Sequence, residues 1–403
     1  MDRITVVGNG FAALSAVDRL RRREAGLEVV LVAPEPVLMD YPGRVRVPCG
    51  LRASKEVRVP LDGFLRRRRV RYQRARLTGL RRAGRLVLTD RGEIRADGLV
   101  SACGARFVEN LPGIEHSISL ADGGAAARAR PDRIDLLEQG ALAFADNPLD
   151  HRASRGAPLL EVLFSVDTLL RRQGRRHRFA LRLFSPAPTP ARQLGPRAAR
   201  LVSDEMQRRG IRRHLGEAPL RFDPGHVVTE RGRTGADLIC FMPGLAGPEW
   251  LAASGLSASP AGFLEADEFR RARTTGRVYV AGSCGGYPGP AWRSRDLRQS
   301  ELQARAAADN PLSELRTGRP GEPFRIRTSF TIDTLDAGIL VYRTPRRDRA
   351  VRGGRPPALA QAPARMASRA RLPRRDAPGP GARPRPKRCG TPVREAQCCC
   401  RIS

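Results

Sequence analysis

The sequence contains no apolar run long enough to cross a membrane. Hydrophobic residues make up 41% of the 403 positions, but no run approaches the roughly 18 residues that a spanning helix needs. The first β-branched run begins at Ile4, which leaves no room before it for a secretory signal peptide. We therefore expect a cytoplasmic protein whose contact with a membrane, if it makes one, is peripheral and at the inner face of the cell membrane.

Ligand patterns for metal ions are also missing. None of Cys49, Cys103, Cys240 and Cys284 belongs to a CxxC pair, and the five histidines lie far apart along the chain. This spacing fits neither a zinc site nor the disulfide framework of a secreted protein. We predict no metal site and interpret these cysteines as reduced thiols.

Aromatic residues are scarce, at 5% of the chain, and this scarcity bears on the net charge of +32. Proteins that bind single-stranded nucleic acid combine basic side chains with aromatic ones on which the bases stack. Here arginines cluster without aromatics, as at residues 21–23 and 66–69. We predict no nucleic-acid binding and interpret the charge as a solvated arginine-rich surface; attraction to anionic lipid is the alternative.

The C-terminal segment lacks aromatic side chains altogether. Residues 346–403 hold 16 Lys and Arg against 3 Asp and Glu, and most of the remainder is Pro, Ala and Gly. Such a composition buries too little apolar area to offset the entropy of ordering, so we predict a disordered basic tail. The tail is either a native segment that touches an anionic partner or the product of out-of-frame translation of a GC-rich gene.

What the chain does contain is a glycine turn near its N-terminus. The stretch ITVVGNGFAALSAV places a buried β-branched strand before Gly8 and a helical pattern after Gly10. Gly8 permits a tight turn, Gly10 lets the backbone approach a pyrophosphate, and Ala13 lets helix and strand pack closely. The helix N-terminus adds free N–H groups and the positive end of a dipole. A strand at residues 28–33 then completes a dinucleotide-binding pattern.

Four segments, in this order, resemble one family. They are the opening GNGFAA, the strand end Ala102-Cys-Gly104, the stretch EADEFRRARTTGRVYVAG and the segment FTIDTLDAGILVY. Together they are similar to the sulfide:quinone oxidoreductase branch of the FAD-dependent pyridine nucleotide-disulfide oxidoreductases. The flavoprotein subunit of flavocytochrome c sulfide dehydrogenase and the type II NADH dehydrogenases are relatives of this branch. The resemblance covers about residues 3–345 and implies an α/β fold with two Rossmann-like domains, FAD as cofactor and a quinone as electron acceptor.

The resemblance divides the chain into parts. Residues 1–110 and 236–320 would form the two parts of an FAD-binding domain, and residues 111–235 a second Rossmann-like domain. Residues 321–345 would form a C-terminal interface segment before the basic tail at 346–403. The resemblance also admits a homodimer.

The same resemblance assigns roles to individual residues. Those that would hold the FAD pyrophosphate or line the flavin are Gly8, Gly10, Phe11, Ala12, Ala13, Ala102, Cys103, Gly104, Gly282 and Ser283. Most of the larger family has Gly-Asp where Gly282-Ser283 stands, and the serine can still donate a hydrogen bond. Glu35, just past the second strand, would bind the adenosine ribose. Arg293 would stabilise reduced flavin electrostatically, and a surface role is its alternative.

The sequence has no second glycine-rich turn. A type II NADH dehydrogenase would carry one after the first strand of the middle domain, where residues 147–158 hold proline and arginine instead. This absence favours the sulfide:quinone branch, which has also lost the nicotinamide turn. Binding of NADH through another loop is the alternative.

The cysteines on which sulfide oxidation depends in that branch are missing as well. A hydroxyl cannot form a persulfide, so we expect the usual sulfide mechanism to be absent. Cys103 and Cys284 end strands that would face the flavin, and each is either a catalytic replacement or a small buried residue. The positions where the family's cysteines are expected hold Ser154, Ser329 and, in the third region, Ser117 and Ser119.

We therefore expect an FAD-dependent oxidoreductase of the sulfide:quinone oxidoreductase type whose electron donor is unidentified. The flavin would be reduced by two electrons on one face and would reduce a quinone on the other. One alternative is an NAD(P)H:quinone or NAD(P)H:acceptor oxidoreductase. Another is a non-catalytic FAD-binding subunit that transfers electrons or acts as a scaffold.

Overall fold

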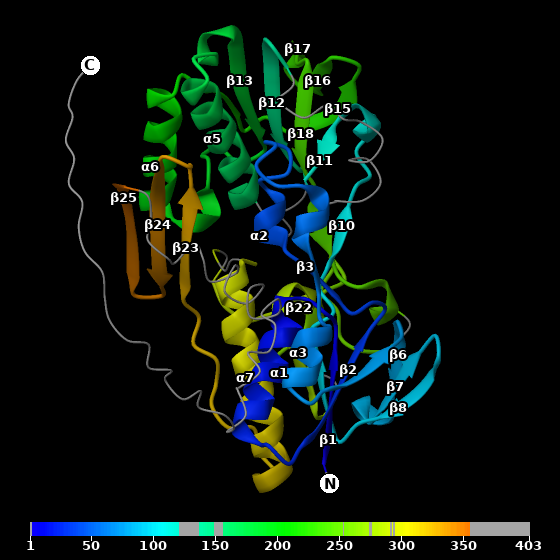
Figure 1. Ribbon diagram of the computed structural model, residues 1–403. Helices are drawn as coiled ribbons and strands as arrows, with labels where there is room; N and C mark the ends of the chain where they lie inside the picture. The colour runs from blue at the N-terminus through cyan, green and yellow to red at the C-terminus, as the bar shows by residue number, and fades with distance from the viewer. Residues whose placement is uncertain are drawn as a thin grey trace, which may run out of the picture. The chain divides into compact units, whose positions relative to one another are not determined.

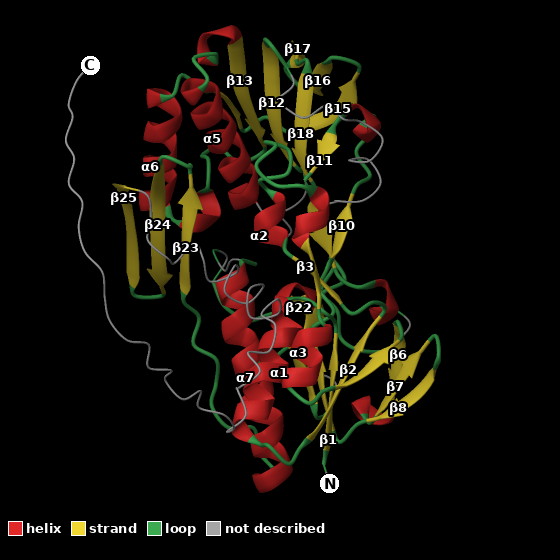
Figure 2. Ribbon diagram, in the orientation of Figure 1, coloured by secondary structure: helices red, strands yellow, loops and turns green. Residues whose placement is uncertain are grey.

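The structure is a computed structural model, and it describes residues 2–120, 137–148, 156–252, 254–273, 276–290, 292 and 295–354. Figure 1 shows the path of the chain, and Figure 2 shows its helices and strands. The described residues contain two five-stranded parallel sheets with helices packed on them, followed by a three-stranded antiparallel sheet. The α/β class with two Rossmann-like sheets, expected from the sequence, is confirmed.

The first parallel sheet has the order β21-β9-β1-β2-β5. The central strand β1 is paired on both sides, and Ile4 and Val6 are fully buried. A strand that is covered on both faces is expected to be a continuous apolar run, as the sequence shows here. The strands are Arg3–Val7 (β1), Glu28–Ala33 (β2), Arg71–Arg74 (β5), Gly98–Ser101 (β9) and Val278–Val280 (β21).

Two helices that are far apart in the sequence lie side by side on this sheet (Figure 1). Phe11–Arg23 (α1) follows the glycine turn directly, and Leu297–Thr317 (α7) is the longest helix of the described chain. The larger side chains of α1, such as Leu14, share one apolar core with small α7 side chains such as Ala304. Packing on α7 therefore fixes where the N-terminus of α1 stands.

Shorter elements surround the first sheet. Three further strands form a separate antiparallel sheet in the order β6-β7-β8, and two antiparallel strands, β3 and β4, flank the short helix α2 along the chain. The bounds are Val37–Met39 (β3), Tyr41–Arg44 (α2), Arg58–Pro60 (β4), Asp62–Arg67 (α3), Leu77–Arg81 (β6), Leu86–Thr89 (β7), Gly92–Arg95 (β8), Leu264–Glu265 (β20) and Gly285–Gly286 (β22). The single-turn helices are Ser54–Val57 (η1), Arg82–Gly84 (η2), Ile114–His116 (η3), Arg176–Arg178 (η5), Arg192–Leu194 (η6), Glu249–Leu251 (η7) and Gly282–Cys284 (η8).

The second parallel sheet has the order β11-β18-β12-β13-β14 and repeats the plan of the first. Helices Gly156–Arg172 (α5) and Pro196–Arg208 (α6) accompany it, and an antiparallel sheet β15-β16-β17 precedes β18 as β6-β7-β8 precedes β9. The strands are Ile118–Ser119 (β11), Gly140–Asp146 (β12), Phe179–Ser185 (β13), Arg212–Leu215 (β14), Pro219–Asp223 (β15), His226–Thr229 (β16), Gly232–Gly235 (β17) and Leu238–Met242 (β18).

The position of β18 corrects one expected domain boundary. The sequence assignment ended the second domain at residue 235 and returned the chain to the first domain with the next strand. All of β18 is buried, and it pairs in parallel with β12, so it belongs to the second sheet. The boundary was wrong because a buried apolar strand fits either sheet equally well. The chain returns along Gly244–Ala246 (β19), which pairs with Arg106–Val108 (β10).

The last described elements form the antiparallel sheet β23-β24-β25, with bounds Thr328–Asp333, Ala337–Thr344 and Arg347–Gly354. This sheet packs on α5 and α6 (Figure 1). The expected disorder from residue 346 is therefore wrong for 347–354. Strand β25 pairs with β24 along its whole length through backbone hydrogen bonds, which do not require apolar side chains, and Arg352 forms an ion pair with Glu205 at 2.7 Å. The remainder of the predicted tail, 355–403, lies outside the described residues.

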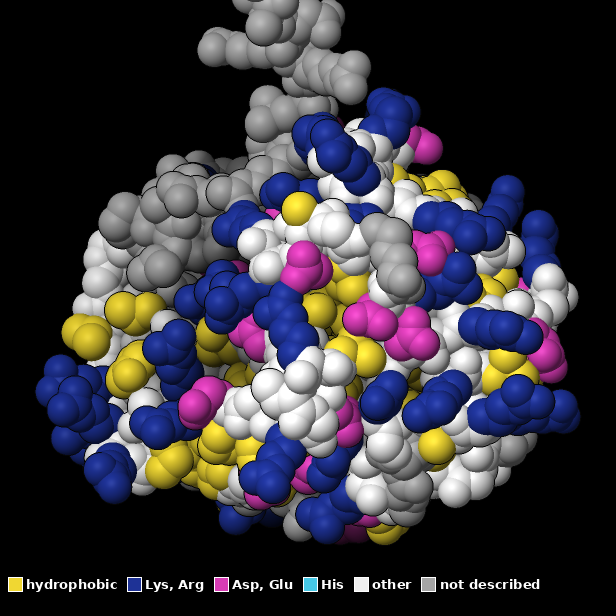
Figure 3. Space-filling view, turned by 90° about the horizontal axis from the view of Figure 1, so that it is seen from below, with side chains coloured by type: hydrophobic (Ala, Val, Ile, Leu, Met, Phe, Trp, Pro, Cys, Tyr) yellow, Lys and Arg dark blue, Asp and Glu magenta, His cyan; other side chains and the backbone are white. Residues whose placement is uncertain are grey.

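Basic side chains are spread over the surface. In Figure 3 the Lys and Arg side chains of the described residues are distributed over the visible face, and fewer acidic side chains lie among them. This distribution agrees with a solvated arginine-rich surface. Among the described residues, no helix is both long and apolar enough to span a membrane.

Candidate functional site

The glycine turn of β1 and α1 forms one end of the site. Gly8 has φ +118° and its N–H donates to the carbonyl oxygen of Val32 at 2.8 Å. Gly10 is the N-cap of α1, no side chain caps this helix end, and the first turn of the helix contains no acidic residue. The N–H groups at the start of α1 thus keep their capacity to bind an anion, as a pyrophosphate site requires.

Two further strand ends meet this turn. The strands β21, β9 and β1 are parallel neighbours, so their carboxyl ends lie at one edge of the sheet. Ala102–Gly104 follows β9, and Gly282 and Ser283 follow β21. Gly282 has φ +76°, and a Cβ atom there would stand 2.9 Å from that of Ala12. Its N–H donates to the side chain of Gln303 at 3.0 Å, which connects this loop to α7.

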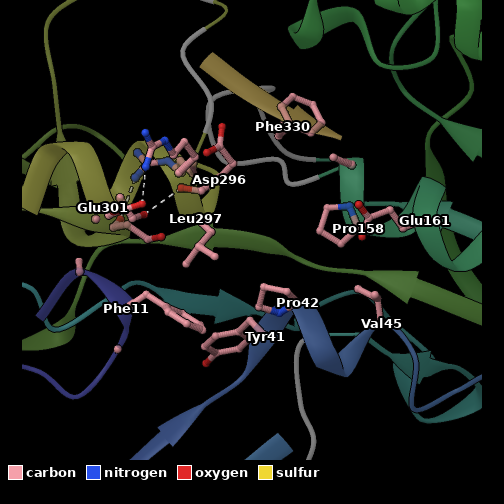
Figure 4. A pocket seen from close by; sticks show the side chains of 18 of the residues that line it. Phe11, Tyr41, Pro42, Val45, Pro158, Glu161, Asp296, Leu297, Glu301 and Phe330 are labelled. Carbon is pink, nitrogen blue, oxygen red and sulfur yellow. Dashed lines mark hydrogen bonds and ion pairs between the residues drawn. The ribbon is translucent and has the colours of Figure 1, made fainter. Parts of the chain in front are cut away.

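These segments open into one cavity of about 710 Å³, a size within the range of ligand sites. It extends from the glycine turn past α7 to α2, α5 and β23 (Figure 4). The wall includes most of the residues that the sequence proposed for the cofactor, namely Gly10, Phe11, Ala12, Ala102, Cys103, Gly104, Gly282 and Ser283.

Three residues proposed for the cofactor are not part of this wall. Gly8 and Ala13 lie beneath the cavity wall. Gly8 contacts the backbone of Ala102, and Ala13 is fully buried in the core under α1. The Glu35 carboxylate forms an ion pair with Arg58 at 2.6 Å and does not line the cavity. Its contact with an adenosine ribose remains a prediction.

A cation lines the cavity near the position where one was proposed. Arg293 lies outside the described residues, but Arg295 belongs to the wall. One Arg295 nitrogen donates to the carbonyl oxygens of Ser283 at 2.7 Å and Gly285 at 3.1 Å. Its guanidinium also lies 3.7 Å from the ring centre of Phe263. Sequence reasoning missed Arg295 because two arginines close together in an irregular loop give no signal that separates them.

The far end of the cavity is largely apolar. It is lined from α2 by Tyr41 and Pro42, from α5 by Pro158 and from β23 by Phe330, with Leu340 and Tyr342 of β24 nearby (Figure 4). No local sequence pattern predicts this wall, because its residues come from four separate elements and each of them resembles an ordinary core residue in the sequence.

Among the apolar side chains of this wall, the Glu161 carboxyl lies beside the ion pair of Asp333 and Arg46. The pKa of Glu161 is raised to about 8, chiefly by burial and also by the neighbouring Asp333 carboxylate, whereas the Asp333 backbone N–H and Arg46 act in the opposite direction. Arg46 is occupied by an ion pair with Asp333 at 3.1 Å. Glu161 is therefore largely protonated at neutral pH and can donate a proton to a ligand in the cavity.

Two cysteines lie at the strand ends near the glycine turn. Cys103 is half-buried and lines the cavity, while Cys284 is fully buried behind it. A hydrogen bond from Cys284 lowers the pKa of Cys103 to about 7, and the same bond and burial raise the pKa of Cys284. The Ser101 hydroxyl lies between them, 3.8 Å from one sulfur and 3.9 Å from the other. Of the two cysteines that the sequence proposed, Cys103 lines the cavity and Cys284 does not, and the approach of either one to a flavin remains a prediction.

The serines that replace the family's cysteines fall in different places. Ser329 lines the cavity on β23. Ser117 and Ser119 are buried, where their hydroxyls donate to the Ile114 carbonyl at 2.8 Å and to the Glu109 carboxylate. Ser154 lies outside the described residues. Among the positions that the structure describes, the one that lines the cavity is Ser329, which offers a hydroxyl and no thiol.

The described residues fit a dinucleotide. A Cβ atom on Gly10 would meet nothing within 4 Å, so this backbone is open to the cavity. Uncapped N–H groups at the start of α1, the Arg295 cation and the glycine-rich strand ends together match the anionic and planar parts of such a ligand.

Comparison with known proteins agrees with this reading of the fold. The sulfide:quinone oxidoreductase of the hyperthermophilic bacterium Aquifex aeolicus is similar, with TM-score 0.78, 20% identity and coverage of 91% of this chain and 90% of that one. Putidaredoxin reductase in its covalent complex with putidaredoxin gives TM-score 0.66, 17% identity and coverage of 91% and 93%. The water-forming NADH oxidase of Lactobacillus brevis gives 0.63, 15% identity and coverage of 85% and 76%.

No family model and no curated protein sequence matches this chain. At these identities the solved structures establish the fold alone, which this chain shares with a sulfide:quinone oxidoreductase, a persulfide reductase and two reductases of electron-transfer systems. The resemblance inferred from the four sequence segments is confirmed at this level.

Proposed function

We propose that this chain is an FAD-dependent oxidoreductase that passes electrons through FAD to a quinone or a similar small acceptor. The observation that carries the proposal is the cavity, in which a glycine cradle for a dinucleotide adjoins an apolar wall that holds a protonated carboxyl group. Bound FAD would supply a two-electron redox centre. The likeness in fold to a sulfide:quinone oxidoreductase supports the same assignment.

The cradle would hold the cofactor through the start of α1 and the two strand ends. Backbone N–H groups near Gly10 would bind the pyrophosphate, since the helix dipole favours negative charge there. Arg295 would fix the Ser283 loop through its two carbonyl contacts and would place a positive charge at the cavity wall. Such a charge stabilises an anionic ligand most where water is excluded.

The apolar wall would receive the acceptor. Aromatic and aliphatic side chains such as Tyr41, Phe330 and Leu340 would pack on a planar quinone ring and keep water away from it. Reduction of a quinone to a hydroquinone consumes two protons as well as two electrons. The Glu161 carboxyl holds one proton in this wall near neutral pH, so it would be the donor of that proton.

The route by which electrons reach the flavin would differ from that of a typical member of the sulfide:quinone branch. Ser329 stands in the cavity where that branch is expected to carry a redox cysteine. Because a hydroxyl cannot be oxidised to a disulfide, we propose that sulfide does not reduce the flavin by the usual route.

Reoxidation of the reduced flavin tests the proposal. The purified protein is loaded with FAD, photoreduced without oxygen and mixed with a soluble short-chain quinone, and flavin absorbance is followed. We expect rapid return of the oxidised spectrum, and we expect Phe330→Ala to raise the quinone concentration for half-maximal rate about tenfold, the equivalent of ~1.4 kcal/mol. Leu220→Ala, at an exposed position on β15, is the control and should leave this concentration unchanged.

Donor assays separate the competing functions. Anaerobic addition of NADH that bleaches the flavin within seconds would favour an NAD(P)H reductase, and rapid bleaching by sulfide would contradict the argument from the serines. A protein that binds FAD but leaves the quinone unreduced would instead be an electron-transfer or scaffold subunit.

The proposed acceptor also implies a place near a membrane. Long-chain quinones dissolve in bilayers, and an arginine-rich surface is attracted to anionic headgroups. We propose peripheral association of a cytoplasmic protein with the inner face of the cell membrane. Flotation with anionic vesicles and failure to float with neutral ones is the expected result; flotation with neither kind would contradict it.

A further inference from the structure

We propose that Cys103 is a nucleophilic thiolate in the cavity wall, that the buried Cys284 is its protonated positioning partner, and that the site reacts with sulfur electrophiles entering the cavity. The inference rests on the arrangement of the two cysteines and does not depend on a quinone as acceptor.

The surroundings of Cys284 favour its neutral form. Its side chain is fully buried, and its sulfur lies 3.3 Å from the Ala281 carbonyl oxygen and 3.4 Å from the Ser101 carbonyl oxygen. Both oxygens accept a proton and would repel a thiolate. Cys284 is thus held as a thiol, and its proton is available to the carbonyls and to the sulfur of Cys103.

The surroundings of Cys103 favour the charged form. This side chain is half-buried and belongs to the cavity wall, so a thiolate there keeps partial access to water. The Ser101 hydroxyl and the Cys284 thiol can both donate to its sulfur. The residue also abuts the glycine turn, because a Cβ atom on Gly8 would stand 2.9 Å from the Cys103 Cα. The nearby N-terminus of α1, which lacks an acidic residue in its first turn, adds a positive dipole end.

The other titratable and charged groups around the pair do not reverse this assignment. Tyr287 is buried, its hydroxyl donates to the Gly282 carbonyl at 2.9 Å, and burial raises its pKa, so it stays neutral. Arg270 lies 4.7 Å from the Tyr287 ring centre, and Arg295 contacts the carbonyls on both sides of Cys284. Both are cations and would stabilise a thiolate at either sulfur, but the two carbonyl oxygens next to the Cys284 sulfur favour the charge on Cys103.

The reaction that follows is a thiol–disulfide exchange. The Cys103 thiolate attacks one sulfur of a small disulfide, a new bond forms between the two sulfurs, and the original S–S bond breaks. The other half of the disulfide leaves as a thiolate and takes the electron pair of the broken bond. No further oxidant or reductant is needed for this step.

The test is the pH dependence of Cys103 modification in the protein as purified. The probe is 4,4′-dithiodipyridine, whose released thiopyridone is counted by absorbance, with peptide mass spectrometry to identify the modified cysteine. We expect a rate that titrates with a midpoint about pH 7, below the value of about 8.5 for a free cysteine. Cys103→Ser should abolish modification at this site.

Two variants separate positioning from a purely structural effect. Cys284→Ala removes the donor and should move the midpoint toward about 8.5, with a rate at pH 7 roughly threefold lower, since the more basic thiolate is rarer but more nucleophilic. Cys284→Ser keeps a donor and should restore a midpoint below that of Cys284→Ala. Cys240→Ala, a buried cysteine in the second sheet, is the matched control and should leave the midpoint unchanged.

Three results would overturn the inference. They are a midpoint in the unsubstituted protein at or above that of a free cysteine, no modification of Cys103, and a midpoint that Cys284→Ala leaves in place. Because the assay involves no quinone, its failure is distinct from failure of quinone reduction, and either proposal can stand without the other.

Discussion

Gly8 lies so close to Ala102 that a Cβ atom on residue 8 would stand 2.2 Å from the Ala102 carbonyl oxygen. The contact joins the turn after β1 to the end of β9, and the left-handed φ of +118° at Gly8 adds a second reason for glycine. The two strand ends at the candidate cofactor site can therefore lie this close only because residue 8 has no side chain.

Substitution of the two glycines in this turn should have different effects. Gly8→Ala should unfold or strongly destabilise the first domain, because the added methyl overlaps backbone atoms. Gly10→Ala should fold normally, since its Cβ meets nothing within 4 Å, but should weaken FAD binding tenfold or more because the methyl enters the cavity. Thermal unfolding and FAD titration measure the two effects. Gly235→Ala, open and outside the cavity, is the control; equal FAD affinity in Gly10→Ala and the control would contradict the proposed cradle.

A buried arginine should dominate the attachment of the C-terminal sheet. Arg209 is 5% exposed and pairs with Asp167 at 2.9 Å, Glu205 at 2.6 Å and Asp336 at 2.8 Å. Asp336 immediately precedes β24, so this guanidinium connects α5 and α6 to that sheet. Arg209→Met removes the cation that these three carboxylates share. Because Asp167 keeps Arg176 and Glu205 keeps Arg352, we expect the free energy of unfolding to fall by about 3 kcal/mol in urea denaturation, the lower end for a broken buried ion pair.

The control for this substitution is an exposed ion pair. Arg305 pairs with Glu301 on the surface of α7, so Arg305→Met should change the free energy of unfolding by about 1 kcal/mol or less. Equal losses in the two variants would show that the buried network is no more important for stability than a surface pair.

The stability of the protein should fall as pH rises through the titration of Glu161. The pKa is about 8 in the folded protein and about 4.3 when the chain is unfolded. The folded state therefore binds more protons between these values, and the contribution of the neutral carboxyl is complete below about pH 4.3 and lost as pH passes 8.

Glu161→Gln should remove this dependence, because the amide stays neutral. Relative to the variant, the unsubstituted protein should lose melting temperature between pH 5 and pH 9, as measured by differential scanning fluorimetry at each pH. Glu249→Gln, which alters an exposed carboxylate, should leave the pH profile of the parent unchanged. Parallel profiles for the parent and Glu161→Gln would show that the carboxyl is already ionised at neutral pH.

Arg295 should matter for cofactor affinity more than other arginines of the same region. Arg295→Met removes both contacts to the Ser283 loop and the positive charge in the cavity wall, so we expect FAD affinity to fall about tenfold. Arg22→Met removes a charge from an exposed ion pair with Asp18 on α1, outside the cavity wall, and should keep the parent affinity. Isothermal titration with FAD distinguishes the two; unchanged affinity in Arg295→Met would remove this residue from the site.

Much of the cofactor end could be predicted from the sequence because its signals are local. The turn at Gly8 and Gly10 and the strand end at Ala102–Gly104 each occupy a few consecutive residues, and their residue types follow from steric limits on the backbone. The errors fell where the signal was not local. The strand β18 was assigned to the wrong domain because its apolar run fits either sheet, and β25 was missed because backbone pairing with β24 leaves no mark in composition.

The sequence by itself determined the fold class and the place of the glycine cradle, since glycine positions and buried β-branched runs restrict the backbone wherever they occur. Only the tertiary structure decided which side chains share the cavity. It brought Glu161 to Asp333, placed Cys284 behind Cys103 and put Arg295 into the wall. The acidity of these groups depends on burial and on neighbours that are distant along the chain, and these neighbours are fixed by packing between elements rather than by any local pattern.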